Sequence, residues 1–248
     1  MEVHAHTHTA RKKWTHYFWE FLMLFLAVFC GFLAENQREH IVEHQREKKY
    51  MKSMLADLAA DTVFINDEEE DSKSIVQWQT SMQKDLYSDS VFEKVKTAYN
   101  QYAGYFRLLT PRFNDQTITQ LRNSGNLRLV RNTEIEGKLS EYWKGINTLM
   151  KVAERVEQRY DVSAEMASRI YNRKYMISQF DTATNRYQYS IDPKAEFMTH
   201  DRNELIAFAN IVNRILSSIE GVYIPVLQLQ KDRAMELILL IKKEYDLK

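Results

Sequence analysis

Residues 14–34 read WTHYFWEFLMLFLAVFCGFLA, and this stretch decides how the rest of the chain is interpreted. From Phe21 to Ala34 no residue is charged. At 1.5 Å per residue, the 21 residues rise about 31 Å as a helix, and a hydrocarbon core is about 30 Å thick. The aromatic residues at its start suit the headgroup boundary. The sequence therefore predicts one transmembrane helix over residues 14–34.

A cleaved signal peptide is the alternative interpretation, because the basic residues 11–13 (RKK) precede the apolar run. Cleavage after Ala34 needs a small residue two positions before it, where Phe32 stands. A lipoprotein site at Cys30 needs a small residue in place of Phe29. Helical sequence then continues without a break, so we expect an uncleaved signal-anchor in a single-pass membrane protein.

The same basic cluster predicts the orientation of the anchor. Residues 11–13 precede the span, whereas Glu35, Arg38 and Glu39 just after it mix both signs. Because Lys and Arg are enriched on the cytoplasmic side of membrane proteins, we expect residues 1–13 to form a cytoplasmic tail. Residues 35–248 then lie on the opposite side of the membrane.

Beyond the span, the composition predicts long helices. The chain has only six Gly and three Pro, which are the residues that end regular elements. Its 34 Lys and Arg balance 34 Asp and Glu, whereas nucleic-acid-binding proteins usually carry a basic excess. We therefore expect no nucleic-acid partner. Cys30, the one cysteine, lies inside the apolar stretch, so the remainder holds no disulfide.

Residues 35–50 are almost all polar, which is typical of a stalk or of one member of a self-associating bundle or coiled coil. From residue 51 onward, apolar residues recur every three or four positions, the period of a helix with one buried face. We predict that 51–248 form an α-helical bundle. The predicted fold class is all-α, with one N-terminal transmembrane helix followed by an elongated antiparallel bundle of about four long helices.

Local signals predict where the first elements end. A capping box over 90–93 starts a helix that runs to about Leu109. A second, short helix is capped at 114–115 and closed by Gly125. Residues 126–130 (NLRLV) are predicted to form an extended link.

The C-terminal half carries the longest helical pattern. It runs over about 133–180, and we expect a loop over 181–199, where the period is lost and a proline occurs. A capping box over 201–204 begins the final helix. Gly221 and Pro225 are expected to kink or split that helix.

Two blocks of the sequence resemble a known family. EFLMLFLAVFCGFLAENQREHIVEHQREKKYMKSMLADLAADT (Glu20–Thr62) is similar to the N-terminal signature of an uncharacterised family of Gram-negative bacteria. TITQLRNSGNLRLVRNTEIEGKLSEYW (Thr117–Trp143) is similar to a second block of that family. The family is a domain of unknown function whose members are single-pass inner-membrane proteins. The resemblance implies a periplasmic location for the bulk of the chain, and it implies no activity or active site.

Glu20 is the first candidate for function. A carboxylate within a transmembrane segment is costly and usually has a partner. Glu20 either pairs inside an oligomer or with another membrane protein, or it extends toward the headgroups among Trp14, Tyr17 and Trp19. The residues leave both interpretations open.

Arg122, Arg128 and Arg131 flank the turn at Gly125 and form the densest polar, non-periodic cluster of the domain. Guanidinium groups bind carboxylate and phosphate through paired hydrogen bonds, so these three residues are a possible anion site. Packing and surface ion pairs are the alternative explanation for them.

Four further patterns have a structural explanation that we prefer. His4, His6 and His8 (HAHTH) read as a polar tail, although alternating histidines bind transition metals. The pair at 40 and 44 has zinc-ligand spacing but lacks a third ligand, so it reads as solvated stalk. The acidic run 67–71 lacks the ligand spacing of a calcium loop and reads as a solvated bend. Aromatic residues on the helical stripes are expected in the core: Trp78, Tyr99, Tyr102, Trp143 and Tyr160.

No P-loop, GxGxxG, GxSxG, HExxH or CxxC motif occurs in the sequence, so we expect no enzyme, cofactor or metal. The function that the residues favour is a non-enzymatic, membrane-anchored scaffold or accessory subunit of a cell-envelope complex. Its expected partners are membrane lipid and either a second copy of itself or another membrane protein. The alternative is a periplasmic ligand-sensing bundle that acts through a partner protein.

Overall fold

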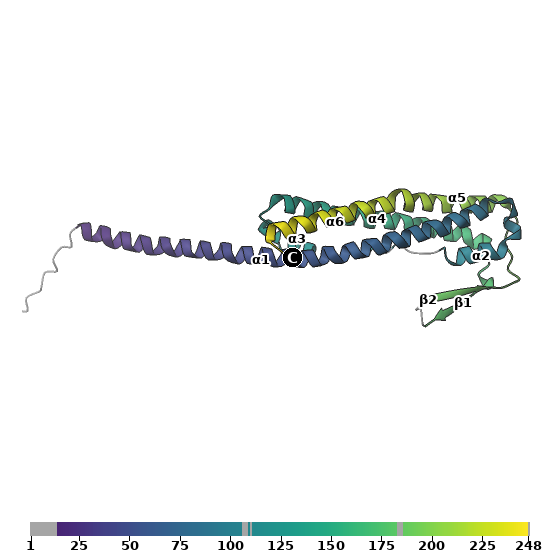
Figure 1. Ribbon diagram of the computed structural model, residues 1–248, viewed down its shortest axis with the longest axis horizontal. Coiled ribbons are helices and arrows are strands. Elements are labelled where there is room, and N and C mark those ends of the chain that lie inside the picture. Colours follow the sequence, from purple (N-terminus) through teal and green to yellow (C-terminus); the bar gives the residue numbers. More distant parts are fainter. Residues whose placement is uncertain (1–13, 106–108, 110, 183–185, 248) are drawn as a thin grey trace, which may run out of the picture. The chain divides into compact units, whose positions relative to one another are not determined.

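The computed structural model describes residues 14–105, 109, 111–182 and 186–247, and helices dominate it (Figure 1). The elements in this part of the chain are α1 (Trp14–Tyr87), α2 (Val95–Ala103), α3 (Gln116–Asn123), α4 (Thr133–Ile170), β1 (Met176–Asp181), β2 (Arg186–Ile191), α5 (Arg202–Ser218) and α6 (Ile224–Tyr245). The predicted all-α helical bundle with a long apolar N-terminal helix is confirmed. The chain divides into two compact units, Met1–Lys49 and Tyr50–Lys248, which we describe separately.

The first unit is described from residue 14 onward, as the N-terminal part of α1. It contains a window of mean hydropathy 2.0, of which 0% is buried. Apolar side chains are exposed around the whole helix, for example Leu24 at 71% and Phe32 at 66%. A helix that is apolar on every side and unburied by protein has the composition and length of a membrane span. This segment is therefore a candidate membrane anchor, and the predicted tail 1–13 lies outside the described residues.

The second unit also holds an apolar helical segment, Arg202–Tyr245, with a mean hydropathy of 1.3. Here 39% of the apolar window is buried inside the protein. Leu205, Phe208 and Leu237 are completely inaccessible to solvent. The segment therefore has the burial of a core helix in a bundle, and its hydropathy is explained by packing.

In the second unit, α1 and α4 run in the same direction. The Tyr142 hydroxyl donates to Asp61 Oδ2 over 2.6 Å, and Gln79, further along α1, donates to Tyr160, further along α4. Two parallel neighbours require a connection that returns along the whole unit. Residues 88–132, which include α2 and α3, make that connection.

The third long segment, α5 with α6, runs antiparallel to α1. The Tyr223 hydroxyl donates to Glu68 over 2.7 Å, whereas Tyr87, later in α1, donates to Asn210, earlier in α5. The second unit thus contains three long helical segments in its described residues, where about four were expected (Figure 1). The difference arises because α2 and α3 are short.

α5 and α6 are joined by a π-helical turn, Ile219–Tyr223. Pro225 has no backbone N–H and cannot continue an α-helical ladder, so the chain widens for one turn before it. Tyr223, in that turn, is completely buried. The expectation that the final helix is split near Gly221 and Pro225 is confirmed.

A β-hairpin replaces part of the predicted helix and loop. The helical pattern was expected to reach residue 180, but α4 ends at Ile170, and the following Tyr171 forms an isolated bridge with Phe197. β1 and β2 then pair antiparallel, with Met176 opposite Ile191. The expectation of a loop over 181–199 was therefore wrong for β2, since its alternating polar and aromatic residues (RYQYSI) suit a strand.

Other local predictions also need correction. α2 begins at Val95 and ends at Ala103, not near residue 109, and the side chain of its N-cap, Lys94, makes no capping hydrogen bond. In place of the expected capping box, Ser88 caps a 3₁₀ turn over Asp89–Glu93. Residues Asn126–Leu129 form a 3₁₀ turn rather than an extended link, since Gly125 at φ 67° reverses the chain just before them. Asp201 does cap α5, by accepting from Asn203 N.

The core of the second unit consists of two hydrophobic clusters, separated by a polar layer. One cluster includes Ile65, Leu149 and Leu227, and the other includes Leu58, Ile146 and Ala234. Asp61 on α1 and Gln230 on α6 lie between the clusters, and both bond to Tyr142 of α4, which belongs to the second cluster; these three residues form the layer. Polar groups inside a core stabilise it only when they are paired, so this layer specifies the register of the three segments.

Candidate functional site

The first candidate site is one face of the apolar segment of α1. His16 Nε2 lies 3.0 Å from Glu20 Oε1, one helical turn apart, and both side chains are about half exposed. These two residues and Ala27 line the same shallow surface hollow. Gly31 follows Ala27 by four residues, and nothing lies within 4 Å of where its Cβ would be. Helical spacing therefore puts an ionisable pair and two small residues on one face.

The opposite face of this segment is aromatic. Phe21, Phe25 and Phe29 stack in series, with ring centroids 6.2 and 5.9 Å apart. Sequence analysis singled out Glu20 but not His16, although the i, i+4 spacing was a readable signal. The intrahelical pair adds a partner for Glu20 that neither of the two earlier interpretations included.

Of the three arginines predicted as a possible anion site, Arg122 lines a groove of the structure. Arg122, in α3, lies over the Trp143 ring of α4, with its guanidinium carbon 4.9 Å from the ring centroid. It lines an open groove of about 460 Å³, whose other lining residues are Ser140, Trp143, Lys144, Asn147, Thr148 and Lys151. Arg128 and Arg131 are exposed and do not line this groove. Lys144 and Lys151 were missed, although their seven-residue spacing places them on one face of α4.

The polar layer in the core is fully bonded around Asp61, which is 0% exposed. Asp61 Oδ1 accepts from the backbone N and the Nδ2 of Asn114, over 2.7 and 3.1 Å, and Oδ2 accepts from Tyr142. Gln230 Nε2 donates to the Tyr142 carbonyl over 2.9 Å. Burial raises the pKa of Asp61, and these hydrogen bonds offset part of the increase. These bonds join α1, α4, α6 and the loop residue Asn114 just before α3. We therefore interpret this layer as a structural site.

The acidic run 67–71 was expected to form a solvated bend. That expectation was wrong, because the run lies within the continuous helix α1. Glu68 accepts from the Tyr223 hydroxyl, and burial raises the pKa of Glu68. Glu69 binds Lys73 Nζ at 2.6 Å and Gln228 Nε2 at 3.0 Å, and both bonds lower its pKa. The run therefore links α1 to the last helical segment instead of facing only solvent.

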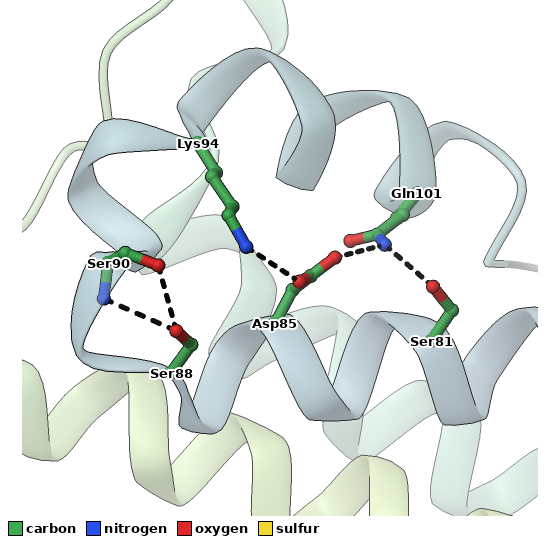
Figure 2. Close-up of polar contacts among 6 residues, drawn as sticks. All are labelled: Ser81, Asp85, Ser88, Ser90, Lys94 and Gln101. Carbon is green, nitrogen blue, oxygen red and sulfur yellow. Dashed lines mark hydrogen bonds and ion pairs between the residues drawn. The ribbon is translucent and has the colours of Figure 1, made fainter.

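A second polar network fixes the corner where α1 ends (Figure 2). Asp85 Oδ2 accepts from Gln101 Nε2 over 2.7 Å, and Asp85 Oδ1 lies 3.5 Å from Lys94 Nζ. Ser88 Oγ accepts from the backbone N of Ser90 over 3.3 Å. Arg202 then donates to the carbonyls of Leu86 and Tyr87, which lack partners within the helix. All of these contacts hold α1, α2 and α5 in place.

Most of the aromatic residues expected in the core are there. Tyr99, Tyr102 and Tyr160 are buried, and the Tyr102 ring stacks on that of Tyr171 with centroids 4.2 Å apart. The two tryptophans are less buried: Trp143 is half-buried against the second cluster, and Trp78 is 46% exposed, with its indole N–H donating to the Gln101 carbonyl over 2.9 Å. A small, mainly apolar cavity of about 160 Å³ lies beside Trp78 and Gly104.

Within the described residues, no group of three His, Cys, Asp or Glu side chains could hold a metal ion. His44 Nδ1 lies 3.1 Å from Glu47 Oε2, so its ring nitrogen has a partner on the same helix. His4, His6 and His8 lie outside the described residues. Cys30 is exposed in the apolar segment of α1.

No protein-family model, curated protein or solved structure matches this chain.

Proposed function

We propose that this protein is a non-enzymatic, membrane-anchored helical scaffold or accessory subunit of a cell-envelope complex, and that it self-associates through the apolar segment of α1. The observation that carries the proposal is the asymmetry of this segment. One face places His16, Glu20, Ala27 and Gly31 together, whereas the other is a stack of phenylalanines.

The bilayer explains why this asymmetry matters. Lipid chains are as apolar as the phenylalanine face, so that face gains little from a protein partner. Glu20 and His16 are costly in an apolar medium and are stabilised when a neighbouring helix supplies further hydrogen bonds. Ala27 and Gly31, four residues apart, allow a second backbone to approach closely. A second copy of the same helix satisfies both requirements.

We further propose that the anchor lies in a bacterial inner membrane, with its N-terminus in the cytoplasm and residues 35–248 in the periplasm. The basic residues 11–13 support this orientation. The resemblance of Glu20–Thr62 and Thr117–Trp143 to a family of Gram-negative inner-membrane proteins supports the placement of the anchor in that membrane.

Self-association is tested with the full-length protein in a mild, uncharged detergent. Sedimentation equilibrium measures its mass for the wild type, for Gly31→Leu on the proposed face, and for Phe29→Leu on the opposite face. We expect an oligomeric wild type, a dissociation constant at least tenfold higher for Gly31→Leu, and little change for Phe29→Leu. A monomeric wild type without any co-purifying protein argues against the proposal, and so do equal effects of the two variants.

Orientation is tested by cysteine labelling. In a Cys30→Ala background, Ser217→Cys places one thiol at an exposed position of α5. We expect a membrane-impermeant maleimide to label it in cells whose outer membrane has been made permeable, without lysis of the inner membrane. Labelling only after complete lysis contradicts the periplasmic placement.

A further inference from the structure

The groove between α3 and α4 carries an uncompensated positive charge. Three of its seven lining residues are the cations Arg122, Lys144 and Lys151, and none of the seven is acidic. Within the described residues, none of these three cations lies within ion-pair distance of a carboxylate. The protein as a whole has a net charge of zero, so this local excess is not a consequence of a basic composition.

Three lysines elsewhere in the described part of the second unit, Lys73, Lys94 and Lys138, form ion pairs. Lys138, one turn before the groove on the same helix, lies 2.9 Å from Glu236 and 3.7 Å from Glu141. Lys73 lies 2.6 Å from Glu69. Glu141, the acidic residue nearest in sequence to Lys144, is thus engaged by Lys138. The groove thus brings three cations together, and none of its lining residues is acidic.

Two other polar groups of the groove have partners on their own helix. Asn147 Nδ2 donates to the Trp143 carbonyl over 2.9 Å, and Thr148 Oγ1 donates to the Lys144 carbonyl over 3.0 Å. The charged donors that the groove offers to a ligand are the three cations. Arg122 is held against the Trp143 ring, which orients its planar guanidinium without using an acceptor. A guanidinium oriented in this way suits the paired oxygens of a phosphate.

The spacing along α4 indicates the size of the ligand. Lys144 and Lys151 are seven residues apart, which is about 10 Å along a helix axis. A ligand with several negative groups can therefore contact both ammonium groups without drawing the two side chains together. The arrangement fits a ligand with two or more negative groups separated along a line.

We propose that this groove binds a phosphate-bearing polyanion, with Arg122 gripping one phosphate and Lys144 and Lys151 neutralising the others. Phosphates of this kind occur both in soluble polyphosphates and in the headgroups of anionic lipids. The proposal is independent of self-association, because the groove lies wholly within the second unit.

The experiment uses the full-length protein in nanodiscs of uncharged phosphatidylcholine, titrated at low ionic strength. Inorganic tripolyphosphate is one probe, and a short-chain cardiolipin, which carries two phosphates per molecule and is kept below its micelle concentration, is the other. The variant K144E/K151E removes the groove cations, and K242E/K243E makes the same change in charge at two exposed lysines of α6, outside the groove. Thermophoresis measures the dissociation constants, and circular dichroism checks that each variant is folded.

We expect tripolyphosphate to bind the wild type, and K144E/K151E to raise its dissociation constant at least tenfold more than K242E/K243E does. Arg122→Lys keeps the charge but loses the planar fork, so we expect a several-fold weaker affinity. Binding of the lipid probe alone, with the same loss in K144E/K151E, assigns the groove to lipid headgroups. If neither probe binds, or if both double variants weaken binding equally, the proposal is wrong.

Discussion

The two ends of helix α1 have the same backbone conformation but opposite environments. Near the N-terminus, apolar side chains surround the helix and are exposed, with Leu24 at 71%. In the second unit, apolar residues form one stripe, and Met51, Leu58 and Met82 are completely buried. A continuous helix thus does not reveal its surroundings, whereas the distribution of apolar residues around it does. One end suits lipid, and the other suits three packed helices.

Each end also contains a carboxylate among apolar neighbours. Asp61 accepts hydrogen bonds from three donors, all supplied by other elements of the second unit. Glu20 has His16 on the same helix. The core thus supplies Asp61 with partners from other elements, whereas the partner described for Glu20 comes from its own helix.

The largest expected effect is on the apolar, N-terminal end of α1, the candidate anchor. The double variant Phe25→Arg with Leu26→Arg places two charges near the centre of the span, each costing about 3 kcal/mol on insertion. We expect the protein to leave the membrane pellet after an alkaline carbonate wash. The control Phe25→Leu should stay in the pellet, and a doubly charged variant that also pellets would show that this segment is not the anchor.

The next effect concerns the polar layer of the core. Asp61→Ala leaves the Tyr142 hydroxyl and the Asn114 N–H without an acceptor, and we expect a loss of about 3 kcal/mol of unfolding free energy. Thermal melts followed by circular dichroism should show a midpoint lower by about 6–12 °C. Adding Tyr142→Phe to this variant should cost little more, since its partner is already gone. A midpoint within 2 °C of the wild type (about 1 kcal/mol) contradicts the role of this layer.

A matched pair of glycines on α4 sharpens the contrast between packed and open positions. A Cβ at Gly145 would lie 1.9 Å from Gln230 Oε1, whereas nothing lies within 4 Å of one at Gly137. We expect Gly145→Val to destabilise the protein by about 2 kcal/mol through overpacking and loss of the Gln230 bond. Gly137→Ala should stabilise it by about 0.5–1 kcal/mol through helix propensity. Urea titrations measure both, and changes of the same sign refute the packing.

The smallest effect is the pH dependence of the core carboxyls. Burial raises the pKa of Asp61 and of Glu68 above their ordinary values of 3.8 and 4.5. A carboxyl with a higher pKa in the folded state binds its proton more tightly there. Its contribution to stability is therefore fully present below the unfolded pKa and is lost as the pH rises through the folded pKa.

Urea midpoints measured from pH 4 to pH 7 check this sign. We expect D61N/E68Q to lose less stability over this range than the wild type. The variant lacks the two carboxyls that bind protons more tightly in the folded protein and release them on unfolding. Glu69→Gln is the control of opposite sign, since hydrogen bonds from Lys73 and Gln228 lower the pKa of Glu69. Parallel curves for the wild type and D61N/E68Q rule out a contribution from these carboxyls.

The sequence alone determined the helices, the candidate anchor and the break near Pro225. It did so because helix formers, apolar period and the missing N–H of proline are local properties of the chain. It also picked out Glu20 and Arg122. It did not reveal the hairpin after Ile170. The apolar period predicted a helix as far as residue 180, ten residues beyond the end of α4.

Tertiary structure alone decided which residues meet. The polar layer joins Asp61, Tyr142 and Gln230, and the groove joins Arg122 with Lys144 and Lys151 from a different helix. These partners are distant in sequence, and their contacts depend on how the helices are oriented and staggered. Orientation and stagger result from packing across the whole core, which no local pattern of residues encodes.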